Sequence, residues 1–498
     1  MNKKKEEVVV LDQKANLSKD VSRGIPDVAA TEVKQGTEIN IAPAVPAQPA
    51  LKEAEEAVPQ IKIKKLSKKW LLFFALFLFV FITISLVVVK NMLPKVPYLL
   101  GKKGEIVWWG LQEEEAVVAP LIKEFQENNP DVRITYLKQS PKDYGDRLAS
   151  LFKEGKGPDI FEIHDSWIPD FRDDFSKLPS SIMNEEEYAK TFLTPISSTL
   201  LTKKGIVGFP LSYDAIALYI NENMFSVAGK ELPKTWDDVV TLSDPNKGQL
   251  TIRGKNNEII QSAIALGNTS NVDNWQEVIA LMLVQNGVNL SNPTGTRAQD
   301  VFKYYANFSR NGVWNNRLPP STLFFSKGSL AMYFGTVSRA PEILKENSNL
   351  RFRTVAIPQL PKNSPNDPDY SYASFWLQAV WNKSTNENVA WKFLKFMTEK
   401  TSIEKSNAIR KSIKGIEMPP PRNDMVFDYI KHPIIGSVMG DAAVAKTWYL
   451  AGNADDGGKG INTNVANIFS TIIQKEKVED ATLLTLKKTL SSYGITVK

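Results

Sequence analysis

The feature that most constrains this chain is an apolar segment from Trp70 to Val89 that contains no charged residue. At about 1.5 Å per residue, a helix of this length spans roughly 30 Å, the thickness of the hydrocarbon core of a bilayer. A cleavable signal peptide is the alternative, but the segment begins far from the N-terminus and no small-x-small cleavage motif follows it. We therefore expect an uncleaved transmembrane anchor within residues 62–95, which include a basic flank.

The lysines beside this segment predict its orientation. Five lysines fall between Lys62 and Lys69, whereas the four that follow are spread from Lys90 to Lys103. The denser cluster favours a cytoplasmic N-terminus. We expect a single-pass protein of the cell membrane whose residues from 104 onward lie on the extracytoplasmic face.

Residues 1–61 contain no aromatic residue and include an Ala-, Pro- and Glu-rich stretch. Such a segment cannot bury enough apolar surface to offset its chain entropy. We expect a disordered cytoplasmic tail.

From residue 104 the pattern becomes that of an α/β protein. Short apolar strands are predicted at Glu105–Trp109, Val132–Leu137 and Ile160–Ile163, with a helical face (Val117, Leu121 and Phe125) and a helix at Tyr144–Phe152 between them. This strand–helix alternation predicts a parallel sheet. Later strands are expected at Ile206–Phe209, Ala215–Ile220, Leu330–Phe334, Phe352–Ile357 and Phe375–Trp381, and a helix after Ser384–Asn386.

Composition excludes several classes of chemistry. The chain has no cysteine, which removes disulfides, thiolate metal sites, cysteine nucleophiles and the lipid-modified cysteine of a lipoprotein. With only His164 and His432, a histidine-based metal site is disfavoured, and we expect no metal and no cofactor. The net charge of +6 is small for 498 residues, so a nucleic-acid partner is not expected.

Catalytic motifs do not suggest an enzyme. The chain lacks a G-x-S-x-G elbow, a phosphate-binding loop and an H-E-x-x-H motif. We interpret the S-x-x-K match at Ser402–Lys405 as a solvated helix end and Asp455–Gly460 as a flexible surface loop. The acidic run Glu113–Glu115 suits a helix start, where the helix dipole favours carboxylates.

Aromatic and short polar residues follow several predicted strands. Trp108 and Trp109 end the first strand, His164–Trp167 follow the third, and Tyr213 and Tyr333–Thr336 end two later ones. Open parallel sheets bind ligands at this edge. An aromatic ring covers the C–H face of a sugar while a carboxylate accepts its hydroxyls, although plugging the core explains any single ring equally well.

Six ordered segments between Gly104 and Lys498 resemble the family 1 extracellular solute-binding proteins, the substrate receptors of ABC importers and the family that includes maltose-binding protein. The segments are EIVWWGLQEEEAVVAPLIKEFQENNPDVRITYL, KEGKGPDIFEIHDSWIPDF, GFPLSYDAIALYINENMF, LPKTWDDV, FSKGSLAMYFGTVSRAPEI and SFWLQAVWNKSTNENVAWKFLKFMT.

The resemblance implies a two-lobed α/β fold of the type II periplasmic-binding-protein-like kind, with ligand held in an interlobe cleft. One lobe would comprise residues 104–211 and 359–420, and the other residues 212–358 and 421–498. The chain would cross between the lobes near Pro210–Tyr213, Ile357–Pro361 and Met418–Arg422, where prolines break elements.

The resemblance also implies site residues. Asp165 and Trp167 match a polar-plus-aromatic turn, and Trp448–Tyr449 resembles a pair that stacks on a sugar ring. Gly335–Thr336 occupies a turn where a family member presents a stacking Trp; this chain has none there, and Tyr333 or Arg339 could compensate. The expected ligand-binding residues are Trp108, Trp109, Asp165, Trp167, Tyr213, Tyr333, Thr336, Trp376, Trp448 and Tyr449.

These observations predict a membrane-tethered receptor that captures a sugar or oligosaccharide and delivers it to the permease subunits of an ABC importer. The transmembrane helix would replace the lipid anchor that the absent cysteine excludes. One alternative keeps the fold but binds a polyamine or another cation in an aromatic and carboxylate cage. Another is a cell-envelope enzyme or sensor on the same scaffold.

Overall fold

The structure is a computed structural model that describes residues 104–362, 364–452, 454–475 and 479–495. These residues belong to one unit of the chain, Lys95–Lys498. The expected tail (residues 1–61) and apolar anchor segment lie outside the described residues. Within the described part of the chain, every helix is too short or too polar to span a bilayer.

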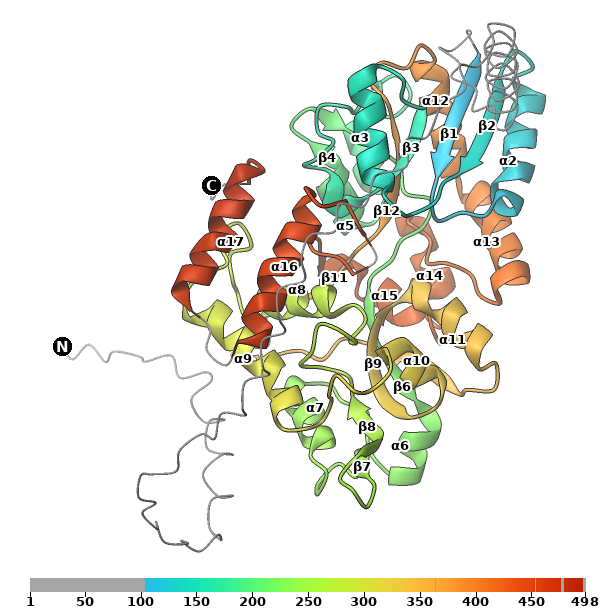
Figure 1. Ribbon diagram of the computed structural model, residues 1–498. Helices are drawn as coiled ribbons and strands as arrows, with labels where there is room; N and C mark the ends of the chain where they lie inside the picture. The colour runs from blue at the N-terminus through green and yellow to red at the C-terminus, as the bar shows by residue number, and fades with distance from the viewer. Residues whose placement is uncertain (1–103, 363, 453, 476–478, 496–498) are drawn as a thin grey trace, which may run out of the picture. The chain divides into compact units, whose positions relative to one another are not determined.

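The first sheet has the strand order β12-β3-β1-β2 (Figure 1). β1 (Glu105–Gly110) lies between its parallel neighbours β2 (Arg133–Lys138) and β3 (Ile160–His164). β12 (Trp376–Val380) is antiparallel to β3 and forms the other edge. The predicted parallel arrangement of the first three strands is therefore confirmed.

Helices connect and cover these strands. α2 (Glu115–Asn128) buries the predicted face of Val117, Leu121 and Phe125, and α3 (Tyr144–Glu154) forms the second crossover. α12 (Glu387–Met397), the expected late helix, and α13 (Lys400–Lys414) pack against α2.

The second sheet has the order β10-β6-β9-β8-β7. Its two central strands, β6 (Ile216–Asn221) and β9 (Leu330–Thr336), are antiparallel and buried along their whole length, as expected for strands covered on both faces. β10 (Phe352–Val355) pairs with β6, and β8 (Ile259–Ile264) runs parallel to β9 and pairs with β7 (Ile252–Arg253).

The remaining elements surround the two sheets. Eight of the described α-helices lie between β3 and β10 in the chain. They are α4 (Glu185–Thr191), α5 (Thr194–Leu200), α6 (Glu222–Ala228), α7 (Trp236–Ser243), α8 (Trp275–Gln285), α9 (Thr296–Arg310), α10 (Ser321–Ser326) and α11 (Ala340–Glu346). The C-terminal part adds α14 (Val426–Tyr429), α15 (Gly436–Gly440), α16 (Ile461–Gln474) and α17 (Asp480–Ser492). Two small ladders join β4 (Leu201–Thr202) to β5 (Gly205–Ile206) and β11 (Ser371–Tyr372) to β13 (Ala445–Lys446).

The later predicted strands are confirmed within a few residues except for Ile206–Phe209. Only Gly205–Ile206 is a strand there, in the β4–β5 hairpin. Phe209 instead makes a single bridge to Gln378, exchanging backbone hydrogen bonds of 2.9 and 2.8 Å. Pro210 follows at once and has no N–H, so the ladder cannot continue.

Three segments run side by side between the sheets. Tyr213 N donates to Pro419 O at 2.7 Å, and Ser374 N donates to Asp214 O at 3.1 Å. Gln359, where the chain was expected to return to the first lobe, forms a bridge with Thr235 at the start of α7. The chain joins the first sheet at Trp376, the first residue of β12. The lobe boundaries themselves stay a prediction.

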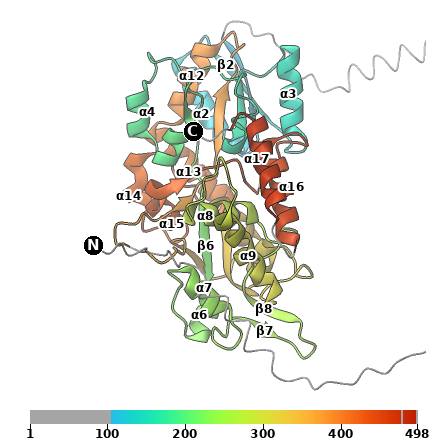
Figure 2. The ribbon, with the colours of Figure 1, turned by 90° about the vertical axis from the view of Figure 1, so that its left-hand side faces the viewer.

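The C-terminal helices contact both halves of the unit. α16 packs against α17 and α9 (Figure 2), where Phe469 meets Phe302 edge to face with ring centroids 5.0 Å apart. At its start, Ile461 N donates to the carboxylate of Asp170 at 3.3 Å, which lies just after the turn that follows β3.

The Asp455–Gly460 segment is not simply a flexible surface loop. Asp456 is buried, and its carboxylate accepts N–H bonds from Asn462 at 2.7 Å and Thr463 at 3.0 Å. It therefore satisfies the free donors in the first turn of α16.

Two other motif interpretations also change. Ser402 is buried inside the first turn of α13 rather than solvated, while Lys405 pairs with Glu124 at 2.8 Å. Glu113 is buried and forms an ion pair with Arg410 of α13, so it links two helices as well as preceding one.

Candidate functional site

Two hydrogen bonds between Asp165 and Phe375 fix the turn after β3 to the start of β12. Asp165 begins a short 3-10 helix, η2 (Asp165–Trp167), and its N–H donates to Phe375 O at 3.0 Å. Phe375 N donates back to the Asp165 carboxylate at 3.1 Å. This reciprocal pair holds both the carboxylate and the neighbouring Trp376 in place.

His164 next to this turn is a structural residue and not a general base. Its Nδ1 accepts the N–H of Ser166 at 3.2 Å, so the ring proton lies on Nε2, which faces Ser374 Oγ at 3.1 Å. Burial lowers its pKa to about 3, which keeps the ring neutral. Although Asp165 lies 3.2 Å from Nδ1, this tautomer is the reverse of the one in a Ser-His-Asp triad and cannot accept the serine proton.

Aromatic rings continue outward from this turn. Trp167 meets Trp376 edge to face with centroids 5.3 Å apart, and Trp376 also meets His164 at 5.1 Å. On its other side Trp167 lies 6.2 Å from Tyr144, which in turn lies 6.4 Å from Trp109. Trp376 and Trp109 are half-buried, so each ring keeps exposed surface.

Asp214 connects the first inter-sheet segment to the turn after β9. Its carboxylate accepts N–H bonds from Val337 at 2.8 Å, Ala215 at 2.9 Å and Ser338 at 3.2 Å. Burial raises the pKa of this carboxyl to about 7, and the hydrogen bonds offset part of that shift. Thr336, which directly precedes this turn, is thereby held next to the segment that carries Tyr213.

Two buried carboxyl groups face the junction of the two sheets. Burial raises the pKa of both Asp165 and Glu277, and Glu277 adds to the shift of Asp165. Glu277, on α8, accepts the N–H of Gly452 at 2.8 Å. Burial also raises the pKa of Tyr213 and Tyr449, with a smaller contribution from the Asp165 charge. The charge of Asp165 therefore acts on groups that come from several segments of the chain.

Several polar atoms at this junction are buried without a hydrogen-bond partner among the described residues. They include Tyr213 Oη, Ser371 Oγ, Trp448 Nε1 and Glu277 Oε2. The adjoining Tyr372 is satisfied, since its hydroxyl donates to the carbonyl oxygens of Trp448 and Leu450. Because buried polar groups are almost always paired, these unpaired atoms can hydrogen-bond to a bound molecule.

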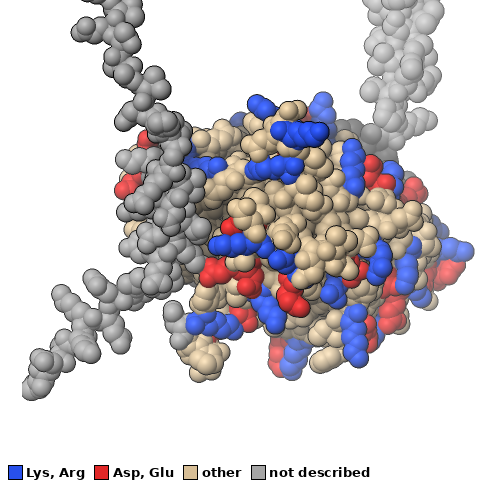
Figure 3. Space-filling model, turned by 90° about the horizontal axis from the view of Figure 1, so that it is seen from below, with Lys and Arg blue, Asp and Glu red and all other residues tan. Residues whose placement is uncertain are grey.

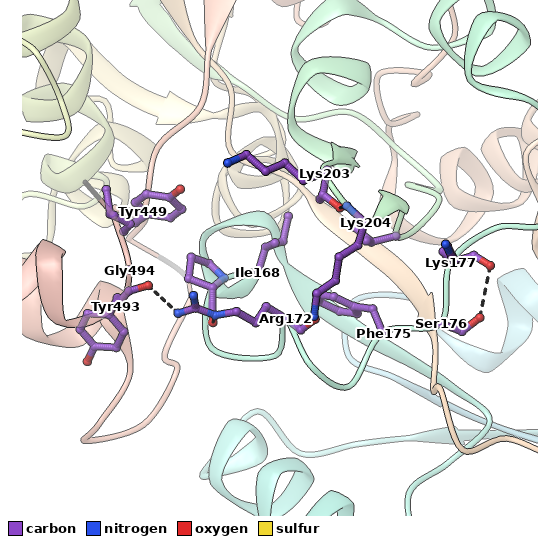
Figure 4. A pocket seen from close by; sticks show the side chains of 14 residues that line it. Ile168, Arg172, Phe175, Ser176, Lys177, Lys203, Lys204, Tyr449, Tyr493 and Gly494 are labelled. Atoms are coloured by element: carbon purple, nitrogen blue, oxygen red, sulfur yellow. Dashed lines mark hydrogen bonds between the residues drawn. The ribbon is translucent and has the colours of Figure 1, made fainter. Parts of the chain in front are cut away.

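A cavity of about 600 Å³ adjoins this junction. Tyr449 and Ile168, which follows Trp167, form part of its wall, as Figure 4 shows. Its volume is that of a typical small-molecule site. The other described residues that line it are Pro169, Arg172, Phe175, Ser176, Lys177, Thr202, Lys203, Lys204, Val207, Tyr493, Gly494 and Ile495.

Most of the predicted site residues come together here. Asp165 is fixed beside Trp376, which meets Trp167, and the Asp165 charge acts on Tyr213 and Tyr449. Thr336 is placed by Asp214, Trp109 joins through Tyr144, and Trp448 accepts from the Tyr372 hydroxyl through its carbonyl oxygen. Their role in binding stays a prediction.

Trp108 and Tyr333 lie elsewhere, in the cores of the two sheets. Trp108 is fully buried, donates to Gln378 Oε1 at 2.7 Å and meets Tyr136 at 4.7 Å. Tyr333 bonds through its hydroxyl to Thr322 at 2.7 Å. Both rings fill the core, and core packing by itself explains why an aromatic residue occupies each position.

Sequence reasoning missed Glu277 and the Ser371–Tyr372 strand. Glu277 is a single carboxylate within the apolar helix α8, and that isolated charge was a usable signal. Nothing local distinguishes Ser371, because only the β11–β13 pairing brings it opposite Ala445, three residues before Trp448.

A metal-ligand cluster is not a feature of the described part of this site. Among the described residues, no group of His, Asp and Glu is arranged to hold a metal ion. Figure 3 shows Lys and Arg side chains interspersed with Asp and Glu on the face seen from below.

Comparisons with known proteins agree on one family. A family model described as bacterial extracellular solute-binding protein matches residues 120–411. A putative binding protein of Brucella abortus is 23% identical over 293 residues, which cover 56% of this chain and 67% of that protein.

Solved structures share the fold. An ABC substrate-binding protein from Listeria monocytogenes, in complex with cycloalternan, superimposes with a TM-score of 0.60 at 15% identity, covering 80% of this chain and all of that one. The sugar-binding protein MalE from Xanthomonas citri gives 0.61 at 16%, covering 78% and 97%. The two-lobed α/β fold expected from the sequence is confirmed.

Proposed function

This chain belongs to the bacterial extracellular solute-binding proteins, and we propose that it captures a sugar or oligosaccharide and delivers it to the permease of an ABC importer. The cycloalternan complex of the Listeria protein and the sugar-binding protein of Xanthomonas citri support the ligand class. In this proposal the lobes, 104–211 with 359–420 and 212–358 with 421–498, close over the ligand and no bond is broken.

The observation that carries the ligand class is the set of unpaired polar atoms among aromatic rings. Tyr213 Oη is buried within the electrostatic reach of the Asp165 carboxyl group, and Trp448 Nε1 is buried where the Tyr372 hydroxyl donates to the Trp448 carbonyl oxygen. A saccharide offers hydroxyls to such atoms and C–H faces to rings such as Trp376. A purely apolar ligand would leave these polar atoms unsatisfied at a cost.

Calorimetry of the full chain in detergent against mono- and oligosaccharides tests this proposal. We expect saturable binding of at least one sugar, accompanied by a change in tryptophan fluorescence. Binding of a polyamine or peptide with silence across the sugars would refute the saccharide assignment.

Asp165 and Glu277 favour a second candidate, a cationic solute such as a polyamine. Both carboxyl groups are buried and have raised pKa values. A cation would stabilise their charged forms, so its binding would release protons. Spermidine titrations in two buffers of different ionisation enthalpy measure that release, whereas a neutral sugar is expected to show little of it.

We also propose that the segment Trp70–Val89 tethers the receptor with its N-terminus in the cytoplasm. Because the chain has no cysteine, single cysteines can report topology without background. On spheroplasts, a membrane-impermeant maleimide should label a Lys392→Cys variant directly and a Ser18→Cys variant only after permeabilisation. The opposite pattern would reverse the orientation, and a shortened chain would indicate cleavage.

A further inference from the structure

The cavity beside Tyr449 has a strongly basic wall. Four cationic side chains line it, namely Arg172, Lys177, Lys203 and Lys204, and none of the described lining residues is acidic. They come from two neighbouring segments, the loop after η2 and the β4–β5 hairpin. The cavity therefore carries excess positive charge although the face in Figure 3 is mixed.

Most of this charge is not neutralised within the described protein. Lys204 pairs with Asp173 at 2.7 Å, at an exposed position where such a pair is weak. Lys177 and Lys203 make no ion pair with any described residue. Arg172 forms no ion pair with a described residue and hydrogen-bonds to the carbonyl oxygens of Pro169 at 2.9 Å and of Tyr493, although its charge also acts on the nearby carboxyl groups of Asp170 and Asp173.

The guanidinium of Arg172 is thus oriented by neutral carbonyl groups and keeps its positive charge. Its Nε and Nη2 are occupied by the two carbonyl groups, and Nη1 has no hydrogen-bond partner among the described residues. A guanidinium fixed in this way is well suited to a planar anion such as a carboxylate.

The same cavity offers an aromatic surface. Tyr449 is half-buried, and Lys203 extends across the cavity toward it (Figure 4). Tyr493 lies near Arg172 on the same side. A sugar ring on the tyrosine would bring a substituent within reach of the lysine.

We propose that the saccharide of this receptor is acidic, with uronate-type carboxylates bound along the cavity wall that Arg172, Lys177 and Lys203 line. The inference rests on the proposed saccharide function and refines it. The neutral part of the ligand occupies the aromatic junction at Trp376 and Trp448, and the anionic part extends past Tyr449 into the basic cavity.

Matched pairs of ligands test the charge directly. Trimers of galacturonate, mannuronate and glucuronate are each titrated into the full chain in detergent, beside their methyl esters, which keep the sugar rings and replace each negative charge by a methyl ester group. We expect at least one acid to bind about tenfold more tightly than its ester at low salt, with the difference shrinking at 0.5 M salt because the contacts are exposed and screened. Sulfated trisaccharides and citrate show whether the site binds any anion or requires the carboxylate of a uronate.

Variants locate the effect. Lys203→Ala and Lys177→Ala should each weaken binding of the acid about two- to fivefold, the scale of an exposed ion pair, and leave the ester unchanged. Lys203→Arg should restore affinity, and Lys392→Ala, an exposed lysine on α12 outside the cavity, is the control.

The outcomes separate the two proposals. Neutral sugars or esters that bind as well as the acids, or acid binding untouched by the lysine variants, would overturn the acidic assignment while leaving the receptor function intact. Sulfate binding that exceeds uronate binding would overturn the carboxylate assignment. Silence of every saccharide would refute both proposals.

Discussion

Individual buried polar residues fall into two groups, those with a hydrogen-bond partner among the described residues and those without one. Tyr188 Oη donates to Gly208 O at 2.8 Å, and Asp214 accepts three N–H groups. Tyr213 Oη has no partner among the described residues although the side chain is fully buried. The first group stabilises the fold, and the second is available for ligand.

Tyr213→Phe is therefore expected to separate binding from stability. Removing an unpaired hydroxyl should leave the melting temperature unchanged or slightly higher, while saccharide affinity falls several-fold because a hydrogen bond to the ligand is lost. Tyr188→Phe is the matched control, predicted to lower the free energy of unfolding by about 1 kcal/mol with no loss of affinity. Thermal melts and calorimetry of both variants measure this, and a destabilised Tyr213→Phe with normal affinity would contradict the prediction.

Glu162 should make stability depend on pH. Burial raises its pKa to about 7, partly offset by N–H bonds from Leu111 and Gln112. Between its unfolded value of about 4.5 and about 7, the folded state holds a proton that the unfolded state releases. The free energy of unfolding therefore falls as pH rises through this window, by at most about 3 kcal/mol from this group, and levels off above it.

Glu162→Gln tests this dependence because an amide oxygen can still accept both N–H groups. Urea unfolding at pH 5, 6, 7 and 8 should show a shallower decline for this variant than for the parent protein. Glu127→Gln, at an exposed carboxylate on α2, should keep the parent slope. Equal slopes in all three proteins would refute the assignment.

At the scale of elements, α16 depends on a cap supplied by the loop before it. The Asp456 carboxylate accepts from two backbone N–H groups and from the Thr463 hydroxyl at 2.7 Å. Gly460 allows this close approach, because a Cβ there would lie 1.9 Å from the carboxylate carbon. The short Gly-rich run is thus part of the helix start.

Asp456→Ala is expected to cost about 1 kcal/mol of stability, typical of a lost N-terminal cap. Hydrogen exchange should speed up in the first turn of α16 and spread toward α17, which packs on it. Asp455→Ala, at the exposed neighbour, should change neither measurement by a comparable amount. Equal effects of the two variants would argue against capping by Asp456.

At the scale of the whole molecule, the segments that join the two sheets are also neighbours of the site. The backbone segments that contain Tyr213, Ser374 and Pro419 lie side by side and are joined by hydrogen bonds. A relative movement of the sheets would therefore be transmitted to the neighbouring Asp214 and Phe375. Contacts from both sheets and from the C-terminal segment meet at this place. Ligand binding and lobe movement are therefore expected to be coupled.

Residues 95–498 are expected to fold and bind without the first 94 residues, because they form a unit of their own. The shortened chain should melt within about 2 °C of the full chain, since a loss of about 1 kcal/mol shifts the melting temperature of a protein of about 400 residues by roughly 1 °C. It should also keep its saccharide affinity in calorimetry. Loss of affinity on removal of the first 94 residues would show that they contribute to the site.

Much of the architecture was determined by local sequence. The period-two pattern of Val132–Leu137 and the apolar runs at Ile160–Ile163 and Leu330–Phe334 predict strands because burial on one or both faces selects such residues. Asp165, Trp167 and Trp448 could be selected as site residues from their place after strands and from the family resemblance. The absence of cysteine likewise follows from sequence alone.

Other features were decided only by tertiary structure. Trp108 and Trp109 are adjacent and chemically alike, yet one fills the core and the other lies half-buried near Tyr144, because successive side chains of a strand point to opposite faces. Glu277, Ser371 and the basic wall of Arg172 and Lys203 come from distant parts of the chain. Their association depends on how the sheets and the C-terminal segment pack, which no local pattern encodes.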